Sequence, residues 1–209
     1  MTTVLLTGFE AFAGDAANPS GDAVRTLAAE WDGPANLVTE VLPVTFAGAA
    51  ARLRALIAEH SPDVVLAAGL AGGTAAIRVE RVAVNLVDAR IPDNDGAQPL
   101  DEPSVAGAAT GRFATLPTKA IAAAIRAAGI PADVSYSAGT FVCNHVFFTA
   151  LDAAAPTTHA GFIHVPWATG QAPAGIPSLD LRDITRALRI AIETALTGAD
   201  DGLVGGALH

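Results

Sequence analysis

The sequence of 209 residues has a single cysteine, Cys143. One thiol excludes an intramolecular disulfide and a zinc site built from several thiolates, and it fits a reducing compartment. The motifs HExxH, GxGxxG and GxxxxGK[ST] are also missing, so the sequence predicts neither a zinc hydrolase nor a dinucleotide-binding or P-loop protein. We therefore expect no metal site.

Basic residues and long apolar runs are scarce as well. Twelve Lys and Arg stand against 21 Asp and Glu, and a formal charge of −9 opposes binding to nucleic acid or to an acidic membrane. The mean hydropathy is +0.42, but 47 of the apolar residues are alanine and no run approaches the roughly 18 residues of a membrane span. The N-terminus does not resemble a signal peptide. We expect a cytoplasmic protein that contacts neither nucleic acid nor membrane.

Segments of strand-like and helix-like periodicity alternate along the chain, and the length fits about one domain. The expected strands are residues 3–7, 36–41, 63–68, 79–87, 132–136 and 160–165. The expected helices begin after Ser20, near Pro117 and after the turn from Ser137 to Cys143. Two more are expected through Ala49 to Ile57 and through Leu181 to Ala195. Alternation of this kind predicts a single-domain α/β/α sandwich with a mainly parallel central sheet, over residues 1–198.

Several local features carry more specific expectations. Ser20 is a candidate N-cap for the first helix. Residues 88–111 form a loop of about 25 residues, which is long enough to suggest a lid or a pocket wall. Residues 199–209 are expected to be a frayed tail.

Cys143 lies where a predicted strand ends and a helix begins, in Ser-Ala-Gly-Thr-Phe-Val-Cys-Asn-His. Free backbone N–H groups and the positive dipole end of a helix favour a thiolate and can hold an oxyanion. This is the strand, turn and helix arrangement of a nucleophile elbow. A lone cysteine is more often a buried structural residue, so position alone does not decide between the two interpretations.

A nucleophilic thiol needs a base, and five histidines are available. His60 is expected to cap a helix end, His145 to point away from Cys143, His159 to begin a strand and His209 to be terminal. His164 remains, at the carboxyl end of a strand, where open α/β sheets bind ligands. Glu80 shares one face of its predicted strand with aliphatic residues and is the candidate carboxylate that orients the imidazole, although a solvent-facing glutamate is an equal alternative.

Several ordered segments together resemble the pyroglutamyl peptidase I family of cysteine peptidases. They are Thr-Gly-Phe-Glu-Ala-Phe from Thr7, Asn-Pro-Ser from Asn18, Asn85 to Asn94, Asp-Glu-Pro from Asp101, Ser137 to Asn144, and Gly161 to Pro166. The resemblance covers nearly the whole chain. It implies a catalytic triad of Glu80, Cys143 and His164, a cytosolic homotetramer, no cofactor, and removal of N-terminal pyroglutamate from peptides.

The resemblance also assigns a binding pocket. It implies that aromatic rings enclose the pyroglutamyl lactam, that Asn18 lies at the polar end, and that Arg90 and the surroundings of Cys143 hold the oxyanion. The implied pocket residues are Phe9, Phe12, Asn18, Thr45, Leu70, Ile91, Phe141 and Val142. A lactam has no ammonium group, so apolar walls and a small polar pair suit it.

The chain departs from the family pattern after Gly69. The family usually has Gly-Gln-Ala-Gly-Gly-Arg there, whereas this sequence has Leu70 and Thr74 in place of the glutamine and the arginine. Two other functions therefore stay open. One is a cysteine amidase for a different small cyclic substrate, and the other is a non-catalytic relative that binds lactams or peptides.

Overall fold

A six-stranded sheet forms the centre of the computed structural model, which describes residues 1–198, 200 and 202–206. Its strands are β1 (Thr3–Phe9), β2 (Asn36–Leu42), β3 (Val64–Leu70), β4 (Ile77–Glu80), β7 (Ala132–Ser135) and β8 (His159–Val165), in the spatial order β2-β1-β3-β8-β4-β7. The first four strands of that order are parallel, whereas β4 runs antiparallel to β8 and parallel to β7. The predicted mainly parallel sheet is confirmed.

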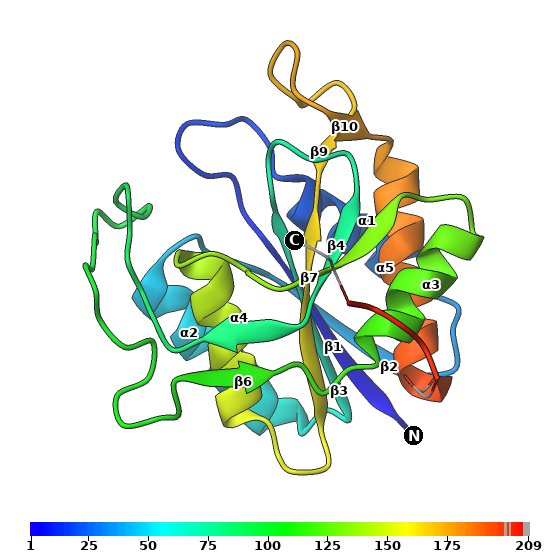
Figure 1. The fold of residues 1–209 in the computed structure, drawn as a ribbon, viewed down its shortest axis with the longest axis horizontal. Helices are drawn as coiled ribbons and strands as arrows, with labels where there is room; N and C mark the ends of the chain where they lie inside the picture. Colours follow the sequence, from blue (N-terminus) through cyan, green and yellow to red (C-terminus); the bar gives the residue numbers. More distant parts are fainter. Residues whose placement is uncertain (199, 201, 207–209) are drawn as a thin grey trace.

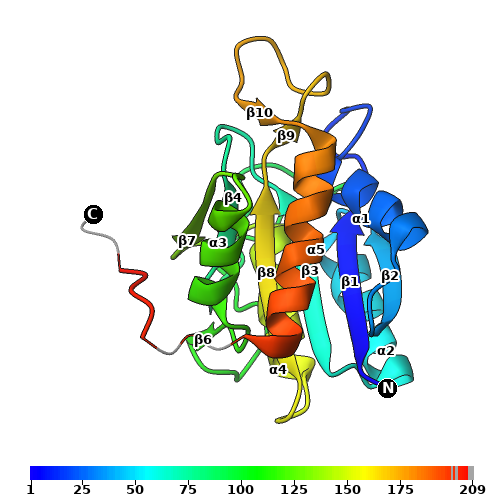
Figure 2. The same ribbon diagram turned by 90° about the vertical axis from the view of Figure 1, so that its right-hand side faces the viewer.

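Helices cover both faces of the sheet, so the molecule has three layers (Figures 1 and 2). They are α1 (Pro19–Glu30), α2 (Phe46–His60), α3 (Thr118–Ala127), α4 (Val142–Ala153) and α5 (Leu181–Thr197). Helices α1, α3 and α5 bury aliphatic residues on one face, and α2 and α4 enclose a second core on the other face. None of the helices in the described part of the chain is long and apolar enough to cross a membrane.

The expected strand over residues 79–87 is wrong in its length. It is two strands, β4 and β5 (Val82–Val84), and β5 leaves the main sheet to pair with β6 (Gly111–Phe113). The break falls at Arg81, whose side chain donates to the carbonyl of Ala114 and stacks over Phe113. Because the chain changes sheet there, Glu80 does not share a continuous face with Val82, although it is buried as expected.

Two further expectations are corrected by polar contacts. Asn18, not Ser20, caps α1, because its side chain accepts from the N–H of Ser20 and Pro19 occupies the first helical position. The long loop over residues 88–111 adds no residue to the cavity described below, although its Asp88, Arg90 and Ile91 line a hollow beside that cavity. Instead Asp93 accepts from the N–H of Phe46 at the start of α2, and Asn94 donates to the carbonyl of Ala11.

The chain after β8 contains two short strands without a periodic signal, β9 (Trp167–Ala168) and β10 (Ser178–Leu179), which pair with each other. Part of the expected tail is held by hydrogen bonds. Asp200 accepts from the N–H groups of Lys119 and Ala120 at the start of α3, and Lys119 Nζ donates to Leu203. Residues 199, 201 and 207–209 of this segment, including His209, lie outside the described residues.

Candidate active site

Glu80 and His164 form a buried pair between two neighbouring strands. Nδ1 of His164 lies 2.8 Å from Oε1 of Glu80, and the residues are 7% and 0% exposed. In the antiparallel register of β4 and β8, Glu80 is opposite Phe162 and Arg78 is opposite His164. Side chains of opposite residues lie on the same sheet face. The register therefore puts the carboxylate and the imidazole diagonally next to each other.

Cys143 is the second residue of α4, close to that imidazole. Phe141 precedes the helix and supplies no side-chain cap, so the first N–H groups of α4 keep their hydrogen-bonding capacity for a ligand. Asn144 is fully buried and fixes the helix start, because its side chain accepts from the N–H of Val84 and donates to the carbonyls of Val84 and Leu86. The helix terminus is thus held against β5.

Gly69 makes room for the thiol. It is the second-to-last residue of β3, and a β-carbon there would lie 2.8 Å from Cys143 Sγ and 2.8 Å from the ring of Phe162. Neither distance is compatible with a normal contact. The glycine is therefore required by close approach, not by backbone conformation.

Burial, hydrogen bonding and charge all act on His164. Burial lowers the pKa of its imidazole. The neighbouring Cys143 and Glu80 raise the pKa by more than burial lowers it, through hydrogen bonding and charge, so that it lies at about 9. At neutral pH the imidazole is therefore in its protonated, cationic form, between the sulfur of Cys143 and the carboxylate of Glu80. Oε2 of Glu80 is buried without a hydrogen-bond partner among the described residues, so the carboxylate has His164 as its partner.

The other described histidines are engaged elsewhere. Nδ1 of His145 lies 2.6 Å from Ser104 Oγ, and burial lowers the pKa of this imidazole. Nδ1 of His159 lies 3.0 Å from the carbonyl of Thr115. His60 is the last residue of α2. Among the described histidines, His164 is the one that lines the same cavity as Cys143.

A cavity of about 390 Å³ opens beside the sulfur. Its residues include six of the predicted pocket residues and several that the sequence did not single out. They are Phe9, Phe12, Asp15, Ala17, Asn18, Val44, Leu70, Ala71, Arg78, Glu80, Ser137, Ala138, Gly139, Phe141, Val142, Cys143 and His164. The rings of Phe12 and Phe141 are 5.3 Å apart and give the cavity an aromatic wall.

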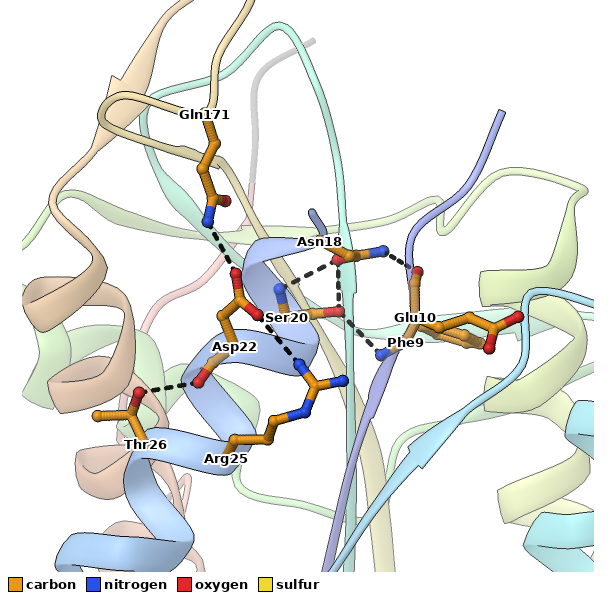
Figure 3. Close-up of polar contacts among 8 residues, drawn as sticks. All are labelled: Phe9, Glu10, Asn18, Ser20, Asp22, Arg25, Thr26 and Gln171. Carbon is orange, nitrogen blue, oxygen red and sulfur yellow. Dashed lines mark hydrogen bonds and ion pairs between the residues drawn. The ribbon is translucent and has the colours of Figure 1, made fainter. Parts of the chain in front are cut away.

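Asn18 lines the cavity, and its side chain forms hydrogen bonds at the start of α1 (Figure 3). Its Nδ2 donates to the carbonyl of Glu10 at 2.9 Å, and its Oδ1 accepts from the N–H and the hydroxyl of Ser20. Ser20 Oγ in turn accepts from the N–H of Phe9. Most of the hydrogen-bonding capacity of Asn18 thus holds the loop and Phe9 in place, and one amide N–H remains for a ligand.

Two of the eight predicted pocket residues, Thr45 and Ile91, and the predicted oxyanion residue Arg90 lie outside the cavity as the described residues define it. Thr45 is buried at the N-cap of α2, and the preceding Val44 lines the cavity instead. Arg90 and Ile91 line an adjoining hollow, which shares Phe12 and Phe141 with the cavity. The structure therefore places them on the outer side of the aromatic wall.

Arg78 is the most informative of the residues that the sequence reasoning missed. It lies two residues before Glu80 on β4, and alternation along a strand puts both side chains on one face. The strand alternation that makes Glu80 a candidate also predicts Arg78 beside it. Ser137 to Gly139 reach the cavity through the turn before α4, which carries no periodic signal.

The α/β/α sandwich carries the arrangement of a cysteine hydrolase. In this arrangement a thiol at a helix start lies next to an imidazole, and a buried carboxylate holds the imidazole from the other side. Comparison with known proteins specifies the family. The family model described as pyroglutamyl peptidase matches residues 2–198. The chain belongs to the pyroglutamyl peptidase family.

Individual relatives agree with this assignment. The chain is 48% identical over 208 residues to the pyrrolidone-carboxylate peptidase of Clavibacter michiganensis, with 98% of each chain covered. It is 50% identical over 212 residues to that of Chromobacterium violaceum, with complete coverage of both. The crystal structure of pyroglutamyl peptidase I from Bacillus amyloliquefaciens matches with a TM-score of 0.93 at 45% identity, covering 98% of this chain and 99% of that one.

Proposed function

We propose that this pyroglutamyl peptidase cleaves the amide bond after an N-terminal pyroglutamyl residue with Cys143 as nucleophile, His164 as acid and base, and Glu80 as the group that orients the imidazole. The observation that carries the proposal is the buried 2.8 Å contact between His164 and Glu80, in the cavity that Cys143 also lines. A structural cysteine would not need a protonated imidazole held against it by a buried carboxylate.

The cavity suits a neutral lactam. A pyroglutamyl ring has no ammonium group, and phenylalanine and aliphatic side chains line most of the cavity beside the sulfur. Its carboxylates are Asp15, which is exposed, and Glu80, which is paired with His164. An acidic anchor for a free N-terminus is therefore missing from the inner part of the cavity that the described residues form.

The backbone of Leu70 supplies the polar pair that a lactam needs. The N–H of Ala71 donates to Val165 of β8, and successive residues of a strand direct their peptide groups to opposite sides. The N–H and C=O of Leu70 therefore face away from β8, towards β1, whose pairing with β3 ends at Ala67. The N–H can donate one hydrogen bond and the C=O can accept one at one edge of the lactam, which makes the side chain at position 70 less important.

The reaction follows from these positions. Cys143 Sγ, its proton taken by His164, attacks the pyroglutamyl carbonyl carbon, and the first N–H groups of α4 hold the oxyanion. His164 then gives the proton to the leaving nitrogen as the C–N bond breaks. Water attacks the thioester with His164 as base, which releases pyroglutamate and regenerates the thiol.

Hydrolysis of a pyroglutamyl arylamide tests the proposal, with the prolyl arylamide as the control for the lactam carbonyl. We expect release of the arylamine from the first and none from the second. Cleavage of neither substrate by the folded protein would contradict the proposed function and favour an amidase for another cyclic substrate, or a binding protein.

We also propose that the protein acts in the cytoplasm as a homotetramer. The support for this is the resemblance stated above and the single cysteine, which suits a reducing compartment. Light scattering coupled to size-exclusion chromatography measures the oligomeric state, and a monomer at micromolar concentration would contradict the tetramer.

A further inference from the structure

Arg78 lies directly opposite His164 in the pairing of β4 with β8. Opposite residues have β-carbons about 4.5–5.5 Å apart and share a sheet face. Arg78 is exposed, whereas His164 is buried beside it. Arg78 also lines the cavity, so its long side chain lies at the cavity on the side of His164.

This guanidinium is not used within the protein. In the part of the chain that the structure describes, the Arg78 side chain has no hydrogen bond and no ion pair, although it is the one Arg or Lys that lines the cavity. Arg81, three residues later, differs in both respects, since it donates to Ala114 and stacks on Phe113. Arg78 is thus a free cation at a binding cavity.

The surrounding charges leave Arg78 available. Glu80, on the same face, is occupied by His164. Asp15, on the loop before α1, also lines the cavity but forms no ion pair with Arg78. The protein as a whole carries a charge of −9, which repels anionic peptides. A cation at the cavity offsets this repulsion locally and therefore favours a carboxylate at that position.

The direction of the reaction defines which part of the substrate meets Arg78. The pyroglutamyl ring occupies the aromatic part of the cavity, and His164 gives its proton to the leaving nitrogen. The residue that carries this nitrogen must therefore pass His164 on its way out. In a pyroglutamyl dipeptide the free carboxylate is separated from the leaving nitrogen by one carbon atom. It therefore lies close to Arg78, which is the residue opposite His164.

We infer that Arg78 is a specificity-determining residue that binds a carboxylate in the leaving part of the substrate. This inference rests on the proposed function and adds the substrate class. The carboxylate is either the C-terminus of a pyroglutamyl dipeptide or the acidic side chain of the second residue of a longer peptide. Both sources present the same planar group to the guanidinium.

Two matched substrate pairs test the inference and separate the sources. Pyroglutamyl-alanine is compared with its C-terminal amide, and pyroglutamyl-glutamate amide with pyroglutamyl-glutamine amide. The quantity measured is the ratio of kcat/KM for the acid to that for the neutral partner in each pair. A ratio taken within one protein cancels any general loss of activity that a substitution causes.

In Arg78→Gln we expect the ratio to fall roughly two- to fivefold in at least one pair, as for a solvent-exposed ion pair. Arg78→Glu should lower the ratio further, and Arg78→Lys should keep most of it. Arg186→Gln on α5 is the matched control, because Arg186 is exposed and lies on the far face of the sheet. Its ratios should equal those of the unchanged protein. Salt should decrease the ratio of the unchanged protein.

The pair in which the ratio changes identifies the source of the carboxylate. Equal ratios in Arg78→Glu and the unchanged protein, for both pairs, would overturn the inference while leaving the proposed function intact. Failure of the unchanged, folded protein to cleave any of the four substrates or the pyroglutamyl arylamide would overturn the proposed function, and with it this inference.

Discussion

Gly69 lies against Cys143 so closely that a β-carbon on the glycine would be 2.8 Å from the sulfur. The last residues of β3 thus determine where the sulfur of Cys143 on α4 can lie. Gly69→Ala should displace the sulfur or the Phe162 ring, and kcat/KM should fall by about 100-fold, the usual effect of a misplacement near 1 Å. Kinetics and thermal unfolding measure the two effects separately. Gly111→Ala is the control, since its nearest contact would be 3.3 Å, and equal activity of both variants would contradict the argument.

Replacing Cys143 by Ala should abolish turnover and leave the fold stable to within about 1 kcal/mol, because alanine is small and suits a helix start. Iodoacetamide should inactivate the unchanged protein with one equivalent bound, as it has one cysteine. Mass spectrometry counts the adduct. Activity that survives in Cys143→Ala would exclude this residue as nucleophile.

The Glu80 carboxylate raises the pKa of His164 together with Cys143. The imidazole is therefore protonated below about pH 9 and loses its proton above that value, so kcat/KM should decrease on the alkaline side near this pH. Glu80→Gln removes one charge that favours the imidazolium, so the alkaline decrease should move to lower pH. Its kcat should fall more than its KM rises. A pH profile identical to that of the unchanged protein would mean that Glu80 does not orient His164.

Leu70→Gln should change kcat/KM by less than about tenfold, or ~1.4 kcal/mol, because glutamine offers the same N–H and C=O to the lactam. If the missing amide mattered, an unpaired lactam group would cost roughly 1–3 kcal/mol and the substitution should lower KM. Steady-state kinetics with pyroglutamyl arylamide distinguish the two. A gain of tenfold or more would indicate a chain adapted to a more apolar substrate.

Asn18 stabilises the start of α1, as Figure 3 shows. Asn18→Ala should lower the free energy of unfolding by about 1 kcal/mol, the usual loss for a helix cap. Asn18→Asp keeps the acceptor oxygen for Ser20 and should recover most of the loss. Chemical denaturation measures both. Asn36→Ala, in an exposed position at the start of β2, is the control and should change stability by less than about 0.5 kcal/mol.

Strong periodicity explains how much of the fold was predictable. Residues 63–68 and 160–165 read as strands because they are apolar on both faces, and β3 and β8 are buried central strands. His164 could be predicted as a site residue because it lies at the carboxyl end of such a strand. These signals are local, so they do not depend on knowing the partner of each strand.

The missed features depend on long-range pairing. The break at Arg81 reflects a hydrogen bond to Ala114, which is 33 residues away. Arg78 lies next to His164 because β4 pairs antiparallel with β8. Nothing in the sequence near residue 78 specifies that pairing. The pairs in β9 and β10 are too short for any periodicity. Tertiary register, not composition, determines these parts of the site.

The position of β8 has a consequence for biosynthesis. It is the last strand of the main sheet to leave the ribosome, yet it lies between β3 and β4 and joins the two halves of the sheet. Before residues 159–165 are synthesised, β2-β1-β3 and β4-β7 have no shared strand, and Cys143 and Glu80 have no imidazole between them. With the proposed catalytic roles of these residues, the nascent chain cannot hydrolyse peptides, and activity begins only when the central strand is inserted.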